Sequence, residues 1–181
     1  MTRSTIDFTP RADDVAIARL AAVAIALTCI ETALPSPVPG VKPGLANIVT
    51  LLVLYRFGWR IAWQVSLLRI VAASLLFGNF LSPGFILSLG GGLASLAALW
   101  LVVQILPSRW FGPVSASIIA AFAHIAAQLA IVYAWLIPHP GLFALTPLFA
   151  GAALVTGIAN GVLAAHFLPR FTLATTALAR P

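Results

Sequence analysis

Six apolar runs follow one another along this chain, and their lengths decide what it can fold into. A helix needs roughly 20 predominantly apolar residues to cross a bilayer, and every run but the second approaches that length. The sequence therefore predicts an all-α membrane protein with six transmembrane helices, of which the second is short. The runs cover residues 15–34, 45–57, 61–77, 85–105, 114–137 and 147–168.

The composition agrees with a membrane protein. Hydrophobic residues make up 61% of the chain and charged residues only 8%, whereas about 25% of the residues in soluble domains are charged. The net charge of +6 is not gathered with aromatic residues on a soluble segment, so we expect no nucleic-acid partner. The single cysteine, Cys29, excludes an internal disulfide and a CxxC site. The lipid bilayer is the expected partner of most of the surface.

The basic residues predict how the chain is oriented, because lysine and arginine are retained on the cytoplasmic side of a membrane. With six crossings and a cytoplasmic N-terminus, Lys42 is the only basic residue outside and Arg69 lies within the membrane. We therefore expect an inner, cytoplasmic membrane protein with two cytoplasmic tails, residues 1–14 and 171–181, around a transmembrane domain of residues 15–170. The other basic residues fall on the cytoplasmic side: Arg3, Arg11, Arg19, Arg56, Arg60, Arg109, Arg170 and Arg180.

Arg69 is the most costly residue within the apolar runs. A central arginine costs roughly 2.5–3.5 kcal/mol on insertion scales, so it should face a partner or a watery cavity rather than lipid. Its guanidinium is a rigid fork of donors that suits a carboxylate or a phosphate. We therefore expect Arg69 to bind a small anionic molecule. The alternative is an internal ion pair with Glu31 that holds two helices in register.

Further polar residues are expected around the same pocket, toward its outer end. Glu31 lies near the outer end of the first helix, and Asn47 lies about one turn into the second. The proline- and glycine-rich residues 35–44 exclude a helix and predict a shaped loop near the mouth. The predicted ligand-binding residues are Arg69, Glu31, Lys42, Asn47, Asn79, His124 and Gln128.

We expect no metal, no cofactor and no catalysis by this chain alone. His124 shares its helical face with no second histidine, cysteine or carboxylate, which favours a hydrogen-bonded core histidine over a metal ligand. The run Gly90-Gly91-Gly92 precedes no Lys-Ser or Lys-Thr pair, so it favours close helix packing over a phosphate loop. No Ser-His-Asp arrangement or paired carboxylate supports hydrolysis or acid–base chemistry.

Three alanines recur at four-residue spacing in the first apolar run. Ala18, Ala22 and Ala26 would form a smooth ridge on which another helix can lie closely. That helix could belong to this chain or to a separate protein, and the spacing leaves both interpretations open.

Several of these residues stand in motifs that resemble one known family. The run Pro39-Gly40-Val41-Lys42-Pro43-Gly44-Leu45-Ala46-Asn47 is the most specific, and the likeness extends over about residues 31–128. The chain resembles the family named heptaprenyl diphosphate synthase component I, also called the Gx transporter family. The other motifs are Leu68-Arg69, Leu76-Phe77-Gly78, Leu81-Ser82-Pro83, Ser88-Leu89-Gly90-Gly91-Gly92-Leu93 and Ala123-His124 with Gln128.

The family's name implies a subunit of long-chain prenyl diphosphate synthesis, although the chain lacks the aspartate-rich motifs of a soluble synthase. More distantly, the predicted bundle is similar to the S components of energy-coupling-factor transporters. In those proteins the alanine-spaced first helix docks the coupling subunit. That similarity would make Ala18, Ala22 and Ala26 a partner-docking face.

Three functions stay open. The first is an S-component-like bundle that binds a small anionic molecule from the outer side and passes it inward with a partner's energy. The second is a noncatalytic membrane subunit that anchors or feeds a prenyl diphosphate synthase. The third is a structural scaffold whose buried polar residues only fix helix register. A paired Arg69 and Glu31 without a cavity would favour this third function.

Overall fold

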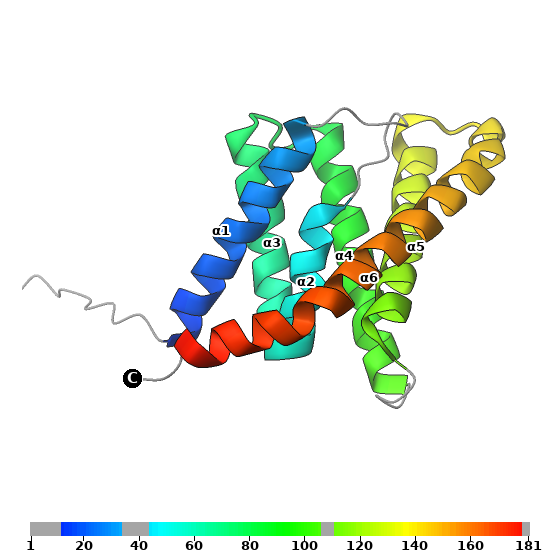
Figure 1. Ribbon diagram of the computed structural model, residues 1–181. Helices are drawn as coiled ribbons and strands as arrows, with labels where there is room; N and C mark the ends of the chain where they lie inside the picture. Colours follow the sequence, from blue (N-terminus) through cyan, green and yellow to red (C-terminus); the bar gives the residue numbers. More distant parts are fainter. Residues whose placement is uncertain (1–11, 34–43, 106–110, 179–181) are drawn as a thin grey trace, which may run out of the picture.

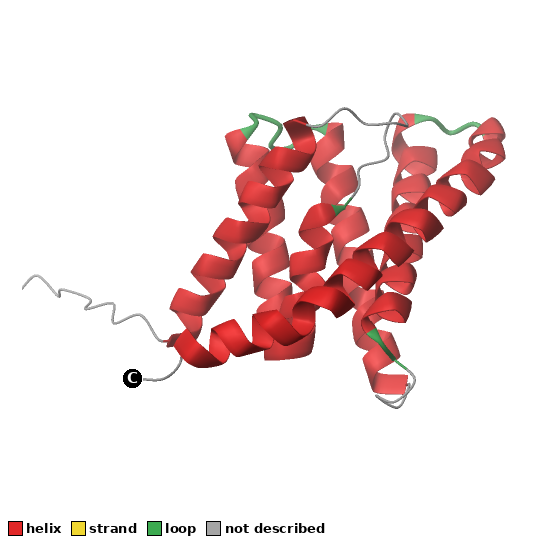
Figure 2. Cartoon of the chain, viewed as in Figure 1, coloured by secondary structure: helices red, strands yellow, loops and turns green. Residues whose placement is uncertain are grey.

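The computed structural model describes residues 12–33, 44–105 and 111–178 (Figure 1). All regular structure in these residues is helical (Figure 2). This confirms the predicted all-α fold and the short second helix. The α-helices are α1 (Ala12–Ala33), α2 (Leu45–Phe57), α3 (Trp59–Leu76), α4 (Pro83–Ile105), α5 (Pro113–Ile131) and α6 (Thr146–Leu178).

Within the described residues, five helices are long and apolar enough to cross a bilayer. These are α1, α3, α4, α5 with the π-turn that follows it, and α6. The remaining helix, α2, has 13 residues and rises only about 20 Å, less than the roughly 30 Å of a hydrocarbon core. The helices therefore indicate a multi-pass membrane protein in which α2 does not span the bilayer by itself.

Two helix ends differ from the prediction. The α-helical part of α5 ends at Ile131 and gives way to a π-turn, Val132–Leu136. At the other end of the chain, α6 continues through Pro169 to Leu178. A proline inside a helix removes one hydrogen bond, and its ring clashes with the carbonyl four residues earlier. Beyond it, Phe171 packs edge-on against Phe57 of α2 with ring centroids 6.2 Å apart, which helps to hold the continuation.

The connection between α2 and α3 is a single residue, Gly58. Its φ of 84° lies in the left-handed region that glycine adopts without a steric penalty. The Gly58 N–H donates to the Leu54 carbonyl at 3.0 Å and so closes the last turn of α2. The second and third helices are therefore joined by a tight turn.

The short helix α2 lies between two halves of the core. On one side Val49 and Val53 pack with alanines of α1, and on the other Leu51 packs with Leu99 of α4. The last helix, α6, crosses the bundle obliquely and packs against both α5 and α2 (Figure 1). Burial on both sides explains why the sequence of α2 is almost wholly apolar.

Close contact between α5 and α6 depends on two glycines. A Cβ on Gly161 would lie 2.5 Å from the Cα of Val114, and one on Gly157 would lie 3.0 Å from the Cα of Ile118. Gly157 and Gly161 form a GxxxG motif, whose small residues let backbones of membrane helices approach closely. The sequence analysis did not identify this motif.

The three-glycine run of α4 also serves packing, as the sequence favoured. Gly90 receives the Ile131 side chain of α5, and Gly92 receives Ile70 of α3. Between them, Gly91 lies against the His124 ring, whose atoms would be 2.6–2.8 Å from an added Cβ. The run therefore holds α4 tightly between α3 and α5.

Candidate functional site

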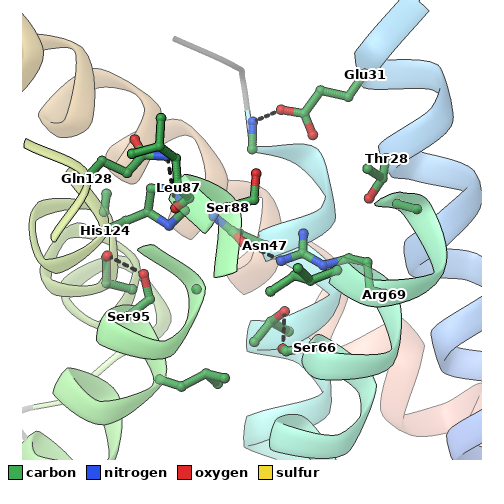
Figure 3. A pocket seen from close by; sticks show the side chains of 18 of the residues that line it. Thr28, Glu31, Asn47, Ser66, Arg69, Leu87, Ser88, Ser95, His124 and Gln128 are labelled. Carbon is green, nitrogen blue, oxygen red and sulfur yellow. Dashed lines mark hydrogen bonds between the residues drawn. The ribbon is translucent and has the colours of Figure 1, made fainter. Parts of the chain in front are cut away.

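The helices enclose a cavity of about 530 Å³ (Figure 3). This is within the range of roughly 300–1,000 Å³ that is usual for ligand pockets. Space arises partly because α2 begins well inside the bundle, below the end of α1 (Figure 1). As a result Gly44 and Asn47, at the start of α2, line the cavity.

More than half of the residues around the cavity have polar side chains, although the helices themselves are mainly apolar. Polar groups inside a membrane bundle are costly and typically face a pathway or a site. They come from all six helices and from the turn after α3. Besides the predicted residues, the polar lining includes Thr28, Thr32, Thr50, Ser66, Ser74, Ser82, Ser88, Ser95, Ser117, Thr156 and Asn160.

Arg69 reaches this cavity from the middle of α3, seven residues and about 10 Å before the helix ends. Its Nη2 donates to Asn47 Oδ1 at 3.4 Å, which is a long hydrogen bond. The buried Nε has no hydrogen-bond partner among the described residues. The guanidinium therefore keeps donor capacity that the described part of the protein does not use.

Glu31 lines the same cavity from the last turns of α1 and is 6% exposed. One carboxylate oxygen, Oε1, accepts the N–H of Gly44, which ties the end of α1 to the start of α2 (Figure 3). In the described residues, Glu31 and Arg69 do not form an ion pair. The two side chains therefore make no direct contact that would hold α1 and α3 in register.

His124 and Gln128 enter the cavity from α5, four residues apart on one face. The His124 ring is held against Gly91 of α4. Gln128 Nε2 donates to the Leu87 carbonyl at 3.5 Å, so this contact is at the limit of a hydrogen bond. Asn79 lines the cavity from the turn between α3 and α4.

Six of the seven predicted ligand-binding residues thus line one cavity: Glu31, Asn47, Arg69, Asn79, His124 and Gln128. The seventh, Lys42, lies outside the described residues. Their role in binding stays a prediction. Across the part of the chain that is described, no three histidine, cysteine, aspartate or glutamate side chains come together as metal ligands would.

The sequence analysis missed the hydroxyl side chains of the cavity. Thr50 of α2 and Ser66 of α3 lie 3.0 Å apart and link the two helices beneath Arg69 (Figure 3). A signal existed in α1, where Thr28 and Thr32 flank Glu31 on one helical face. Single serines in apolar helices give no comparable pattern, because they also occur where hydroxyls bond only to their own helix.

The predicted partner-docking alanines lie on the outer face of α1. Ala18, Ala22 and Ala26 are exposed, whereas Ala21 and Ala24 are buried against α2 and α3. In the described residues the ridge is therefore not used for internal packing. Docking of a partner on it stays a prediction.

The chain was also compared with known proteins. A family model described as "Heptaprenyl diphosphate synthase component I" matches residues 20–167. No curated protein and no solved structure matches the chain. The similarity to S components therefore stays a prediction.

Proposed function

The chain belongs to the heptaprenyl diphosphate synthase component I family, and we propose that it is a noncatalytic membrane subunit linked to prenyl diphosphate synthesis. The family description supports a partner subunit that carries out the chemistry. The apolar helices support a location in the bilayer, where long prenyl chains partition. The sequence supports a noncatalytic role, since its one adjacent carboxylate pair, Asp13-Asp14, lacks the further carboxylates that would hold a metal-bound diphosphate.

The role proposed for this subunit is to bind a small anionic molecule at Arg69. The observation that carries this step is the buried guanidinium with an unused Nε–H inside a cavity. An isolated charge at this depth is unfavourable, and an anion that accepts from Arg69 would remove that penalty through charge-assisted hydrogen bonds. Asn47 supports the same position, because its Oδ1 orients Nη2.

The partnership is tested by producing the chain together with the prenyl diphosphate synthase of the same cell and purifying the membrane fraction. We expect the synthase to copurify with this chain. We also expect this chain, when purified alone, to form no prenyl diphosphate. A synthase that stays in the soluble fraction, with unchanged activity and product length when this chain is deleted, would overturn the link.

The anion site is tested separately by thermal unfolding of the purified protein with inorganic diphosphate, prenyl diphosphates and small carboxylic acids. We expect at least one of these anions to raise the unfolding temperature of the wild type and to leave Arg69→Leu unchanged. Stabilisation that is equal in both proteins would rule out Arg69 as the binding group.

A transport subunit is the second candidate, and the polar lining of the cavity favours it. Polar groups on all walls suit a hydrophilic solute that must cross the bilayer, and the exposed ridge of Ala18, Ala22 and Ala26 would suit an energy-coupling partner. The thermal-unfolding experiment, extended to vitamins and flavins, separates the candidates. Stabilisation by prenyl diphosphates alone would exclude transport of a hydrophilic solute.

A further inference from the structure

The cavity contains a cation and an anion that are not in direct contact with each other. Arg69 projects from α3 and Glu31 from α1, and both line the same space (Figure 3). Two opposite charges that are withdrawn from water normally pair, since each unpaired ion carries a desolvation penalty of several kcal/mol. Here they remain separate, so the free cavity offers one site for an anionic group and another for a cationic or hydrogen-donating group.

The two threonines next to Glu31 on α1 use their hydroxyl hydrogens within the helix. Thr28 Oγ1 donates to the Ala24 carbonyl at 2.9 Å, and Thr32 Oγ1 donates to the Thr28 carbonyl at 2.8 Å. A hydroxyl has one hydrogen, so both oxygens can offer only lone pairs to the cavity. The second carboxylate oxygen of Glu31 has no partner among the described residues. Thr28, Glu31 and Thr32 therefore form an acceptor strip along α1.

Three hydroxyls on other walls repeat this pattern. Ser74 donates to the Val71 carbonyl at 2.7 Å, Ser95 to Ala120 at 2.8 Å and Thr156 to Ala152 at 2.8 Å. The hydrogens of these three hydroxyls are thus bonded to main-chain carbonyls, and their oxygens are left as acceptors. In contrast, Arg69 is the one cationic donor group with unused capacity that faces the cavity in the described residues.

We propose that the cavity ligand is a small ampholyte, a molecule that carries an acid group together with an ammonium or N–H group. Its acid group accepts from Arg69, and its nitrogen donates to the acceptor strip of Thr28, Glu31 and Thr32. This rests on the proposed binding function and narrows its ligand. A prenyl diphosphate supplies the anion but no donor, so it would leave Glu31 unmatched.

The test uses a panel of free amino acids and ω-amino acids whose amine and acid are separated by one to five carbons. Each probe is paired with its N-acetyl form, which keeps the acid, and with its primary amide, which keeps the amine. Binding to the purified protein is measured by thermal unfolding and titration calorimetry. We expect at least one parent ampholyte to bind at least about tenfold more tightly than both of its capped forms, because each cap removes one charge-assisted hydrogen bond.

Two variants assign the two ends of the ligand. Arg69→Leu should weaken binding of the parent and of its N-acetyl form alike, by roughly 10–100-fold. Glu31→Gln keeps an oxygen for the Gly44 N–H, so the protein should fold, but the preference for the parent over the N-acetyl form should disappear. Arg60→Leu serves as the control, because Arg60 is exposed and lies outside the cavity, and this variant should keep that preference.

Binding of N-acetyl probes as tightly as their parents, with dependence on Arg69, would overturn the ampholyte and leave the proposed anion site standing. Stabilisation by prenyl diphosphates or inorganic diphosphate alone would overturn it in the same way. A panel without any detectable binding at millimolar concentration would also overturn it. Binding that persists in Arg69→Leu would instead remove the proposed function itself.

Discussion

Arg69 on α3 and Glu31 on α1 line one cavity and do not form an ion pair. Glu31 is instead bonded to the main chain at Gly44, and Arg69 reaches only Asn47 through a long hydrogen bond. A scaffold that needed these residues for helix register would gain most from pairing them. Their separation across a cavity of about 530 Å³ favours a binding role over a purely structural one.

Both termini are expected on the cytoplasmic side. The described helices alternate in direction from α1 to α6, with α2 returning the chain between α1 and α3 (Figure 1), and basic residues gather at one end of the predicted topology. Reporter fusions after Pro181 and within residues 138–141 should report opposite sides of the membrane. A periplasmic signal from the fusion at Pro181 would contradict the orientation.

Gly91→Ala should lower the stability of the protein and also displace the His124 ring, which lines the cavity. The new Cβ would meet the His124 ring at 2.6–2.8 Å, and overpacking of this kind typically costs about 1–3 kcal/mol. Thermal unfolding in detergent should show a lower midpoint. Gly151→Ala is the matched control, because a Cβ there meets nothing within 4 Å.

The double variant Gly91→Ala with His124→Ala should recover part of that loss, because the smaller side chain removes the clash. Residues in direct contact are expected to be non-additive. Strict additivity of the two single effects would show that the ring does not rest on Gly91.

Gly161→Ala should separate α5 from α6 and destabilise more than Gly91→Ala does. The added Cβ would lie 2.5 Å from the Cα of Val114 and 3.1 Å from the Pro113 carbonyl, and a backbone cannot rotate away as a side chain can. A loss of roughly 3 kcal/mol, at the upper end of the usual cost of overpacking, follows from strain and lost packing. The thermal unfolding midpoints of Gly161→Ala and Gly151→Ala are measured in the same detergent. Equal midpoints would refute the close contact.

The pattern of apolar runs predicted the helices because membrane helices must satisfy their own backbone. The prediction differs from the structure at the end of α6, because the last apolar run ends at residue 168 and the helix continues to Leu178. Phe171 contacts Phe57 of α2. These residues are more than 100 positions apart in the sequence, so no local pattern reveals the contact. The change from α-helix to π-turn after Ile131 likewise could not be predicted, because it alters which backbone groups bond to each other and leaves the composition apolar.

Arg69, Glu31 and Asn47 could be selected from the sequence because charges and amides are rare in apolar helices and costly there. The hydroxyl residues could not be selected in this way. A serine such as Ser95 is common in membrane helices, and only the bundle shows that it bonds to the Ala120 carbonyl of α5. Sequence alone also could not show that Arg69 and Glu31 stay apart.

The most direct measurement is the affinity for the strongest-binding acid probe, per folded molecule, in the wild type, Arg69→Lys and Arg69→Leu. Arg69→Leu removes the desolvation penalty, so it should be produced at least as well as the wild type and lose binding by roughly 10–100-fold. Arg69→Lys keeps the charge without the planar fork and should bind with intermediate affinity. The exposed Arg60, outside the cavity, supplies the control Arg60→Leu, which should bind as the wild type does. If Arg69→Leu is instead unstable and its folded fraction binds with unchanged affinity, Arg69 is a structural residue and the account is wrong.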